Sequence, residues 1–131
     1  MRIVFDTNIL ISALLFPGGR AEVAVLRVIG GVDEMIISRE IIQEVLSVLS
    51  GKFGREAEEL SRVAVLLSEI GTLTVPSARF RVLRDDPDNR ILECAVSGKA
   101  DAIVTGDKEM LALGEFRGIR LLPLSAYLAG N

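Results

Sequence analysis

Short apolar runs alternate with longer amphipathic runs along the whole chain, and turn residues separate them. Five runs of aliphatic and β-branched residues are predicted as strands: 2–5, 35–37, 72–75, 102–105 and 119–122. Runs with a helical period are predicted as helices: 8–15, 21–29, 41–49, 55–71, 89–98, 107–113 and 125–130. Short strands separated by helices are typical of a parallel sheet covered on both faces, so the pattern predicts an α/β fold.

Composition narrows the class of protein. With 131 residues, half of them apolar, the chain is expected to form one domain over residues 1–131 with a proper core. No apolar run approaches the roughly 18 residues of a membrane span, and Asp6 interrupts the one candidate for a secretory signal. We therefore expect a cytoplasmic protein that does not enter membranes.

Histidine is absent, and Cys94 is the only cysteine. This composition excludes an internal disulfide, a cysteine-built zinc site and nucleophile pairs that contain histidine. Cys94 is expected to lie in the core. Catalysis must then depend on carboxylates, hydroxyls, lysine or a hard metal ion bound by oxygen atoms.

The net charge of −3 argues mildly against a surface that attracts nucleic acid everywhere. Most of the basic residues are nevertheless arginines, and four of them lie close together: Arg79, Arg81, Arg84 and Arg90. Arginine is well shaped to bind a phosphate with two hydrogen bonds, but a solvated loop explains the same charges. Both interpretations stay open, as do the roles of Asp85 and Asp86.

Carboxylates follow the predicted strands where a ligand binds in such sheets, beyond the carboxyl ends. Asp6 follows the first strand and Asp107 the fourth, while Asp88 precedes the helix that leads into the fourth strand. Each of these aspartates also occupies a favoured helix N-cap position, which is a purely structural alternative. Capping does not explain Glu44, which follows the second strand on a helix.

A helical wheel separates the glutamates. Glu44 falls beside the buried stripe of helix 41–49, whereas Glu40 faces water. Glu93 falls outside the inner face of helix 89–98, so neither Glu40 nor Glu93 is a candidate. Asp101 precedes the fourth strand, which places it roughly 15–20 Å from the acid that follows that strand. We expect Asp101 to be structural.

Four carboxylates in one cleft raise one another's pKa unless a cation neutralises them. All-oxygen ligation favours Mg²⁺ or Mn²⁺, as one or two ions, and such ions activate water against phosphate esters. The sequence therefore predicts a metal-dependent phosphodiesterase in which four acids bind the metal and carry the catalysis: Asp6, Glu44, Asp88 and Asp107.

Four stretches carry a resemblance to a known family: FDTNILISALLFPGG, ISREIIQEVL, DDPDNRILECAVSGKADAIVTGD and GEFRGIRLLPLSAYL. Together they resemble a compact prokaryotic PIN domain similar to the VapC toxins of toxin-antitoxin pairs. The resemblance covers essentially the whole chain. It implies a three-layer α/β/α sandwich with a five-stranded parallel sheet, and Mg²⁺- or Mn²⁺-dependent cleavage of single-stranded RNA by the same four acids.

The resemblance also implies supporting residues and partners. Asn8 and Thr105 match polar positions that support the first and the last of the acids, whereas Thr7 is expected to be only a turn residue. Homodimers are usual in the family, and many members are silenced by a small antitoxin whose tail enters the acidic groove. The apolar surfaces of the helices in 8–29 are our candidate for self-association.

Two alternatives remain open. A phosphatase of the haloacid dehalogenase kind also has an aspartate after its first strand, but Asn8 and Leu10 replace the second aspartate and the threonine of its D-x-D-x-T motif. No lysine is evidently positioned to complete that site. The other alternative is a non-catalytic RNA- or partner-binding module, which metal titration would leave unchanged.

Overall fold

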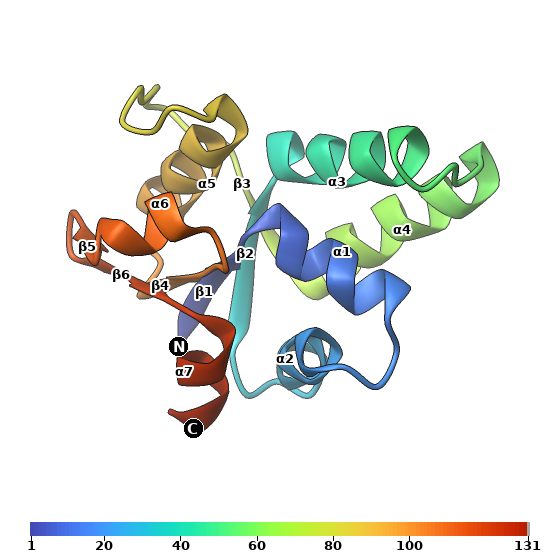
Figure 1. Ribbon diagram of the computed structural model, residues 1–131, viewed down its shortest axis with the longest axis horizontal. Helices are drawn as coiled ribbons and strands as arrows, with labels where there is room; N and C mark the ends of the chain where they lie inside the picture. The colour runs from blue at the N-terminus through green and yellow to red at the C-terminus, as the bar shows by residue number, and fades with distance from the viewer. Residues whose placement is uncertain (131) are drawn as a thin grey trace.

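The computed structural model describes residues 1–130 and has a central sheet surrounded by helices (Figure 1). The strands are β1 (Arg2–Phe5), β2 (Glu34–Ser38), β3 (Gly71–Thr74), β4 (Ala102–Val104), β5 (Glu115–Phe116) and β6 (Ile119–Leu122). The helices are α1 (Thr7–Leu15), α2 (Arg20–Ile29), α3 (Arg39–Gly51), α4 (Ala57–Ile70), α5 (Asp86–Ser97), α6 (Lys108–Ala112) and α7 (Leu124–Ala129).

The sheet has the strand order β3-β2-β1-β4-β6-β5. All five predicted strands are present and pair in parallel, but β5 adds a sixth strand that is antiparallel to β6. The prediction of a purely parallel, five-stranded sheet is therefore wrong at this edge. The turn between β5 and β6 is formed by Arg117 and Gly118, whose φ angles are 51° and 83°, as a tight hairpin requires.

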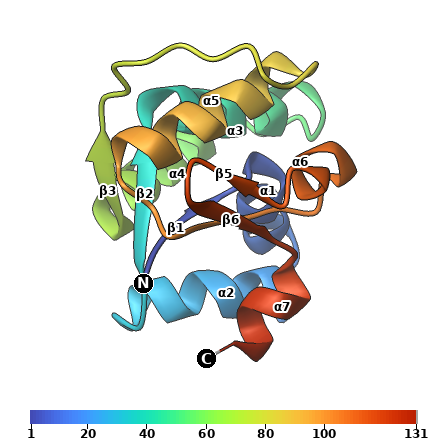
Figure 2. The same cartoon turned by 90° about the vertical axis from the view of Figure 1, so that its left-hand side faces the viewer.

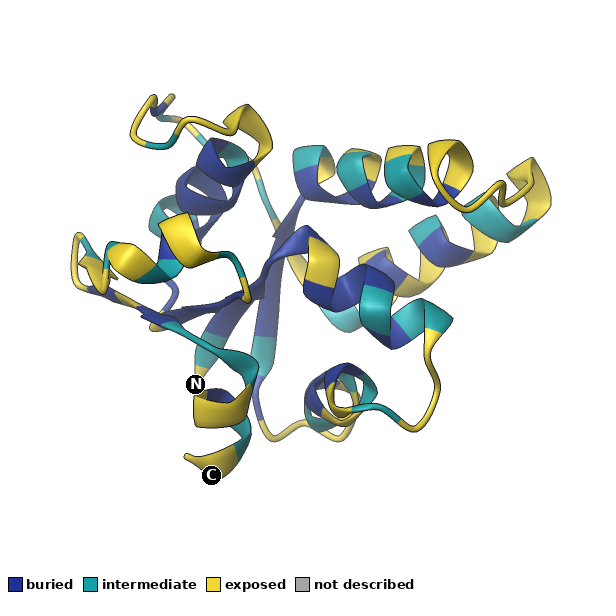
Figure 3. Cartoon of the chain, in the orientation of Figure 1, coloured by how far each residue is buried: buried dark blue, intermediate teal, exposed yellow. Residues whose placement is uncertain are grey.

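The molecule has three layers. In Figure 1, α1 to α4 lie to the right of the sheet, and α5 and α6 lie to its left. The central strands are almost wholly buried between these layers, as Figure 3 shows in dark blue. Cys94, on α5, is fully buried, as predicted. Figure 2 shows that the chain after β3 runs along α5 before it enters that helix.

The topology brings distant parts of the chain to one edge of the sheet. After β1 the chain builds β2 and β3 on one side of that strand, and then crosses to build β4 and β6 on the other. The register pairs Ile3 with Ala102 and Phe5 with Val104, so β1 and β4 end level with each other. This reversal of strand order is the position at which parallel α/β sheets bind ligands.

The opposite edge of the sheet has a structural role. Asp101 accepts a hydrogen bond of 2.8 Å from the backbone N–H of Arg2, which ties the start of β4 to the start of β1. Nearby, the buried carboxylate of Asp33 accepts a 2.6 Å bond from the Tyr127 hydroxyl and lies 3.5 Å from Nε of Arg27. Burial alone would raise the pKa of Asp33, but these partners and the Met1 amino group hold it below its usual value.

No single helix in the described chain is long and apolar enough to cross a membrane. Helices α1 and α2 reach that length and composition only as a pair, and they meet at an angle of 100°.

Candidate metal and active site

Asp6 lies directly after β1, and its carboxylate does not cap the helix that follows. Its backbone N–H donates to the carbonyl of Val104 at 2.9 Å, and its own carbonyl accepts from Ile9 at the start of α1. The side chain occupies the N-cap position but makes no cap hydrogen bond within the described chain. Instead, Oδ2 accepts a 2.7 Å bond from the hydroxyl of Thr105. Capping therefore does not account for this carboxylate, which is only 4% exposed.

Thr105 links two of the predicted acids. Its Oγ1 donates to Asp6 and accepts a 3.0 Å bond from the backbone N–H of Asp107. Asp107 caps α6 through Oδ1, which accepts from the backbone N–H groups of Glu109 and Met110 at 2.8 and 3.1 Å. Its Oδ2 has no hydrogen bond to residues 1–130 in the structure. The capping and site interpretations of Asp107 are thus compatible.

Asp88 lies inside the first turn of α5 rather than at its N-cap. The helix begins at Asp86, the N-cap is Asp85, and Pro87 occupies an early position that suits its fixed φ. The N-cap interpretation of Asp88 is therefore wrong. Its side chain is buried, and its Oδ2 has no hydrogen-bond partner among the residues that the structure describes. A buried carboxylate oxygen without a partner is costly in free energy, so this atom calls for a ligand.

The three aspartates are electrostatic neighbours. Burial, followed by the charges of Asp6 and Asp107, raises the pKa of Asp88 to about 7. Burial also raises the pKa of Asp6, against the opposing hydrogen bond from Thr105, and the charge of Asp107 raises it further. Burial and neighbouring carboxylates therefore disfavour the ionised forms of Asp6 and Asp88.

Glu44 lies on α3 and lines a pocket. The pocket has a volume of about 110 Å³ and is lined by Thr7, Glu40, Ile41, Glu44, Asp86, Pro87 and Arg90. Two of these lining residues, Thr7 and Pro87, are the chain neighbours of Asp6 and Asp88, but neither aspartate is itself in the lining. Glu44 is not among the charges that shift their pKa values. The structure thus places Asp6, Asp88 and Asp107 near one another, and it places Glu44 in a pocket lined by chain neighbours of Asp6 and Asp88.

Two expectations from the helical wheel are wrong. Glu40 is half-buried and lines the same pocket as Glu44, whereas we expected it to face water. Glu93 is 2% exposed, accepts a 2.8 Å bond from the backbone N–H of Phe80 and forms a 2.9 Å ion pair with Arg90. The chain after β3 covers the outer face of α5, a long-range contact that no helical wheel contains.

The support for Asp6 also differs from the expectation. The Asn8 side chain is exposed and makes no hydrogen bond to Asp6 in the described structure, although the backbone N–H of Asn8 helps to lower the pKa of that carboxyl. Thr105 supports Asp6 directly and Asp107 through its backbone. The sequence signal for Thr105 is its match to a supporting position in the family resemblance.

Comparison with known proteins identifies the family, because residues 2–109 match the PIN domain. The chain belongs to the PIN domain family. An uncharacterised protein of Methanocaldococcus jannaschii is 32% identical to this PIN domain in an alignment of 120 residues that covers 86% of this chain and 75% of the relative. PIN domains are generally nucleases, so membership of this family argues against a phosphatase of the haloacid dehalogenase kind.

Two solved structures share the fold of this PIN domain. One is VapBC2 from Rickettsia felis bound to a DNA fragment from their promoter, with a TM-score of 0.70 and 14% identity over 94% of this chain and 98% of that chain. The other is VapBC-1 from nontypeable Haemophilus influenzae, with a TM-score of 0.65 and 17% identity over 95% of this chain and 99% of that chain. Both likenesses confirm the expected α/β fold.

The residues of this PIN domain fit a hard divalent cation. Within residues 1–130, no three acidic or cysteine side chains are close enough to form a complete ligand cluster. Mg²⁺ does not need one, because it commonly binds one or two carboxylates and keeps several waters. The unpartnered Oδ2 of Asp88 and the raised pKa values of Asp6 and Asp88 are what such a cation would relieve.

Proposed function

We propose that this PIN domain is a Mg²⁺- or Mn²⁺-dependent endoribonuclease that hydrolyses phosphodiester bonds of single-stranded RNA in the cytoplasm. The observation that carries the proposal is the placement of two buried carboxylates, Asp6 and Asp88, near Asp107 at the switch point of the sheet, with Oδ2 of Asp88 lacking a hydrogen-bond partner within residues 1–130. Buried carboxylates so close together are unfavourable in a folded protein unless a cation neutralises them. Mg²⁺ or Mn²⁺ bound by oxygen atoms is suited to phosphodiester hydrolysis.

Each residue has a distinct part in this proposal. Asp6 and Asp88 hold the metal, while Asp107 and Glu44 complete the acidic site from its two sides. The hydroxyl of Thr105 fixes the carboxylate of Asp6, and Asn8 contributes a backbone N–H rather than its side chain. When bound, the metal activates water and stabilises the negative charge that develops on the scissile phosphate.

RNA as substrate and a toxin role are proposed from the resemblance to VapC toxins, and the shared fold of two VapBC proteins is consistent with both. An antitoxin partner follows from the same comparison. An apolar groove of about 140 Å³ between α1, α2 and α4 includes Leu26 and Ile29, each more than half exposed. This groove supports the predicted self-association through the helices in 8–29.

The experiment that tests the activity is cleavage of a labelled single-stranded RNA by the purified protein, with Mg²⁺, with Mn²⁺ and with EDTA. We expect cleavage with either metal and none in EDTA or with the Asp6→Asn variant. A non-catalytic binding module would give no cleavage in any of these conditions. Cleavage that survives both EDTA and Asp6→Asn would overturn the acidic site.

A further inference from the structure

The segment between β3 and α5 has no regular secondary structure, yet side chains of α5 hold it in place. Asn89 accepts hydrogen bonds from the backbone N–H groups of Val82 and Leu83 at 3.0 and 2.8 Å, and it donates to the carbonyl of Leu83 at 2.9 Å. One buried amide therefore fixes the backbone just before the helix. Such a segment presents its side chains in defined positions.

A second anchor lies at Phe80. Its backbone N–H donates to Glu93 and its carbonyl accepts from Arg90. Its buried ring packs edge-on against Phe116 at 5.5 Å and lies under the guanidinium of Arg117. The neighbours of Phe80 on both sides, Arg79 and Arg81, are exposed.

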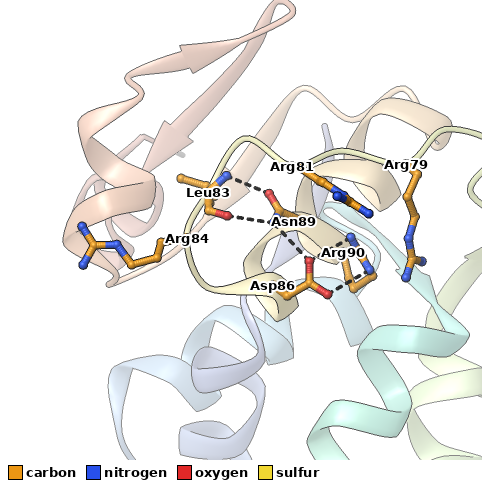
Figure 4. A pocket seen from close by; sticks show the side chains of 7 residues that line it. All are labelled: Arg79, Arg81, Leu83, Arg84, Asp86, Asn89 and Arg90. Carbon is orange, nitrogen blue, oxygen red and sulfur yellow. Dashed lines mark hydrogen bonds and ion pairs between the residues drawn. The ribbon is translucent and has the colours of Figure 1, made fainter.

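Four arginines line one pocket of about 380 Å³, which we call the arginine pocket. Its lining residues are Arg79, Arg81, Leu83, Arg84, Asp86, Asn89 and Arg90. Figure 4 shows Arg79 and Arg81 on one side of Asn89 and Arg84 on the other. The pocket contains four positive charges and one negative charge, although the whole chain has a net charge of −3.

The arginines differ in how far their charge is already balanced. Arg90 pairs with Glu93 at 2.9 Å and with Asp86 at 3.3 Å. Arg84 lies 3.8 Å from Glu109, and its side chain is 90% exposed. Arg79 and Arg81 have no ion-pair partner among residues 1–130. Two guanidinium groups on a fixed segment are therefore free to bind an anion.

The arginine pocket is continuous with the pocket that contains Glu44. Asp86 and Arg90 line both the arginine pocket and the pocket that contains Glu44. The second pocket also contains Thr7 and Pro87, which adjoin Asp6 and Asp88 in the chain. Because the two pockets share Asp86 and Arg90, a strand bound in the pocket of Glu44 can extend into the arginine pocket.

We propose that the arginine pocket binds backbone phosphates of the RNA on one side of the scissile bond, with Arg79 and Arg81 as the main contacts. The inference rests on the proposed function and adds the path of the strand. Guanidinium groups bind phosphate oxygens through two parallel hydrogen bonds, which favours a phosphate chain. Among residues 1–130, no aromatic side chain lines the pocket, so the contact is expected to be independent of base sequence and sensitive to salt.

The test measures binding separately from cleavage. The full-length Asp6→Asn protein is titrated in EDTA against a fluorescein-labelled oligouridylate at several KCl concentrations, with fluorescence anisotropy as the readout. Adding Arg79→Gln and Arg81→Gln should weaken binding by about tenfold or more. It should also reduce the slope of log affinity against log salt by about 1.4, because each phosphate contact with a single strand contributes about 0.7.

Two controls isolate the role of these arginines. Arg20→Gln removes an exposed arginine on α2, at the other end of the molecule, and should leave affinity and slope unchanged. Arg79→Lys with Arg81→Lys should keep the salt slope but lose part of the affinity, because lysine keeps the charge without the planar fork. Both side chains are exposed, so the thermal midpoint should stay the same in every variant.

The inference is overturned if the glutamine variant binds RNA as tightly as the Arg20→Gln control. It is also overturned if only an acidic peptide such as polyglutamate binds in an arginine-dependent way, since the pocket would then fit a protein partner. Cleavage by the wild-type protein decides the proposed function independently. Normal cleavage together with unchanged RNA binding by the glutamine variant would refute the arginine pocket alone.

Discussion

The hydroxyl of Thr105 lies 2.7 Å from a carboxylate oxygen of Asp6, although 99 residues separate them in the sequence. The same hydroxyl accepts the backbone N–H of Asp107. One side chain at the end of β4 therefore aligns two acids from two strands. In the proposed metal site, a residue that orients two ligands in this way is expected to affect metal affinity by about 10- to 100-fold.

Replacing Thr105 by valine keeps the shape and removes both hydrogen bonds. We expect the affinity for Mn²⁺ to fall by about 10- to 100-fold, and the free energy of unfolding to fall by about 1–3 kcal/mol. Isothermal titration calorimetry and urea denaturation measure the two effects. Thr105→Ser, which restores the hydroxyl, should recover most of both, and equal metal binding by the valine and serine variants would contradict this role.

Asp6→Asn should abolish RNA cleavage while the fold is retained. The rate is expected to fall by at least about 100-fold, because a neutral amide is a poor ligand for Mg²⁺. Burial raises the pKa of Asp6, so removing the charge should maintain or increase the free energy of unfolding. Cleavage assays and thermal denaturation on the same preparation check both. A loss of activity accompanied by unfolding would not support the proposal.

Divalent cations should stabilise the protein against heat, and they should do so through Asp88. A ligand that binds only the folded state raises the unfolding midpoint as its concentration increases. We expect Mn²⁺ to raise the midpoint of the wild-type protein by several degrees, and to raise that of Asp88→Asn much less. The wild-type shift should shrink as the pH falls below the pKa of about 7, because protons compete for the same carboxylate. Differential scanning fluorimetry in a buffer without Ca²⁺ measures these midpoints.

Glu44 and Glu40 provide a comparison within one pocket. We expect Glu44→Gln to be inactive, because Glu44 is the acid that reaches the site from α3, and Glu40→Gln to be nearly normal. The test is sharper than the sequence suggested, since both side chains are half-buried and line the same cavity. RNA cleavage by the two variants at saturating Mn²⁺ is the measurement. Equal losses would reject Glu44 as a distinct member of the acidic site.

Asp33 predicts a pH dependence of stability far from the acidic site. Its pKa in the folded protein is lower than its ordinary value of 3.8, so the stability it contributes is present above that value and is lost as the pH falls through the folded pKa. Asp33→Asn should therefore lower the unfolding free energy at neutral pH by about 2 kcal/mol. Urea denaturation should show this difference narrowing below about pH 4. A constant difference would contradict the ionic role.

Sequence periodicity predicted the central strands well, because β1, β2 and β4 are short, buried and rich in aliphatic residues. It did not predict β5, which has only two residues and a turn built from Arg117 and Gly118 rather than the more recognisable Asn-Gly. The start of α5 was also placed too late. Pro87 belongs to the first turn of that helix, whereas the predicted helix begins only at residue 89.

The candidate site was predicted to the extent that it depends on strand ends. Asp6 and Asp107 follow parallel strands, so their proximity required only the topology. The bond from Thr105 to Asp6 required the register of β1 with β4, which the sequence does not specify. The burial of Glu93 depends on a segment that folds back over α5, and a wheel of a single helix contains no such contact.

The crossover that places β4 next to β1 also affects how the chain folds during its synthesis on the ribosome. Asp6 is synthesised first, and Thr105 follows it only 99 residues later. Pairing of Phe5 with Val104 joins segments that are far apart in sequence, and such pairing is a late and slow step of folding. A nascent chain that has not yet reached Asp107 therefore lacks the complete acidic cluster.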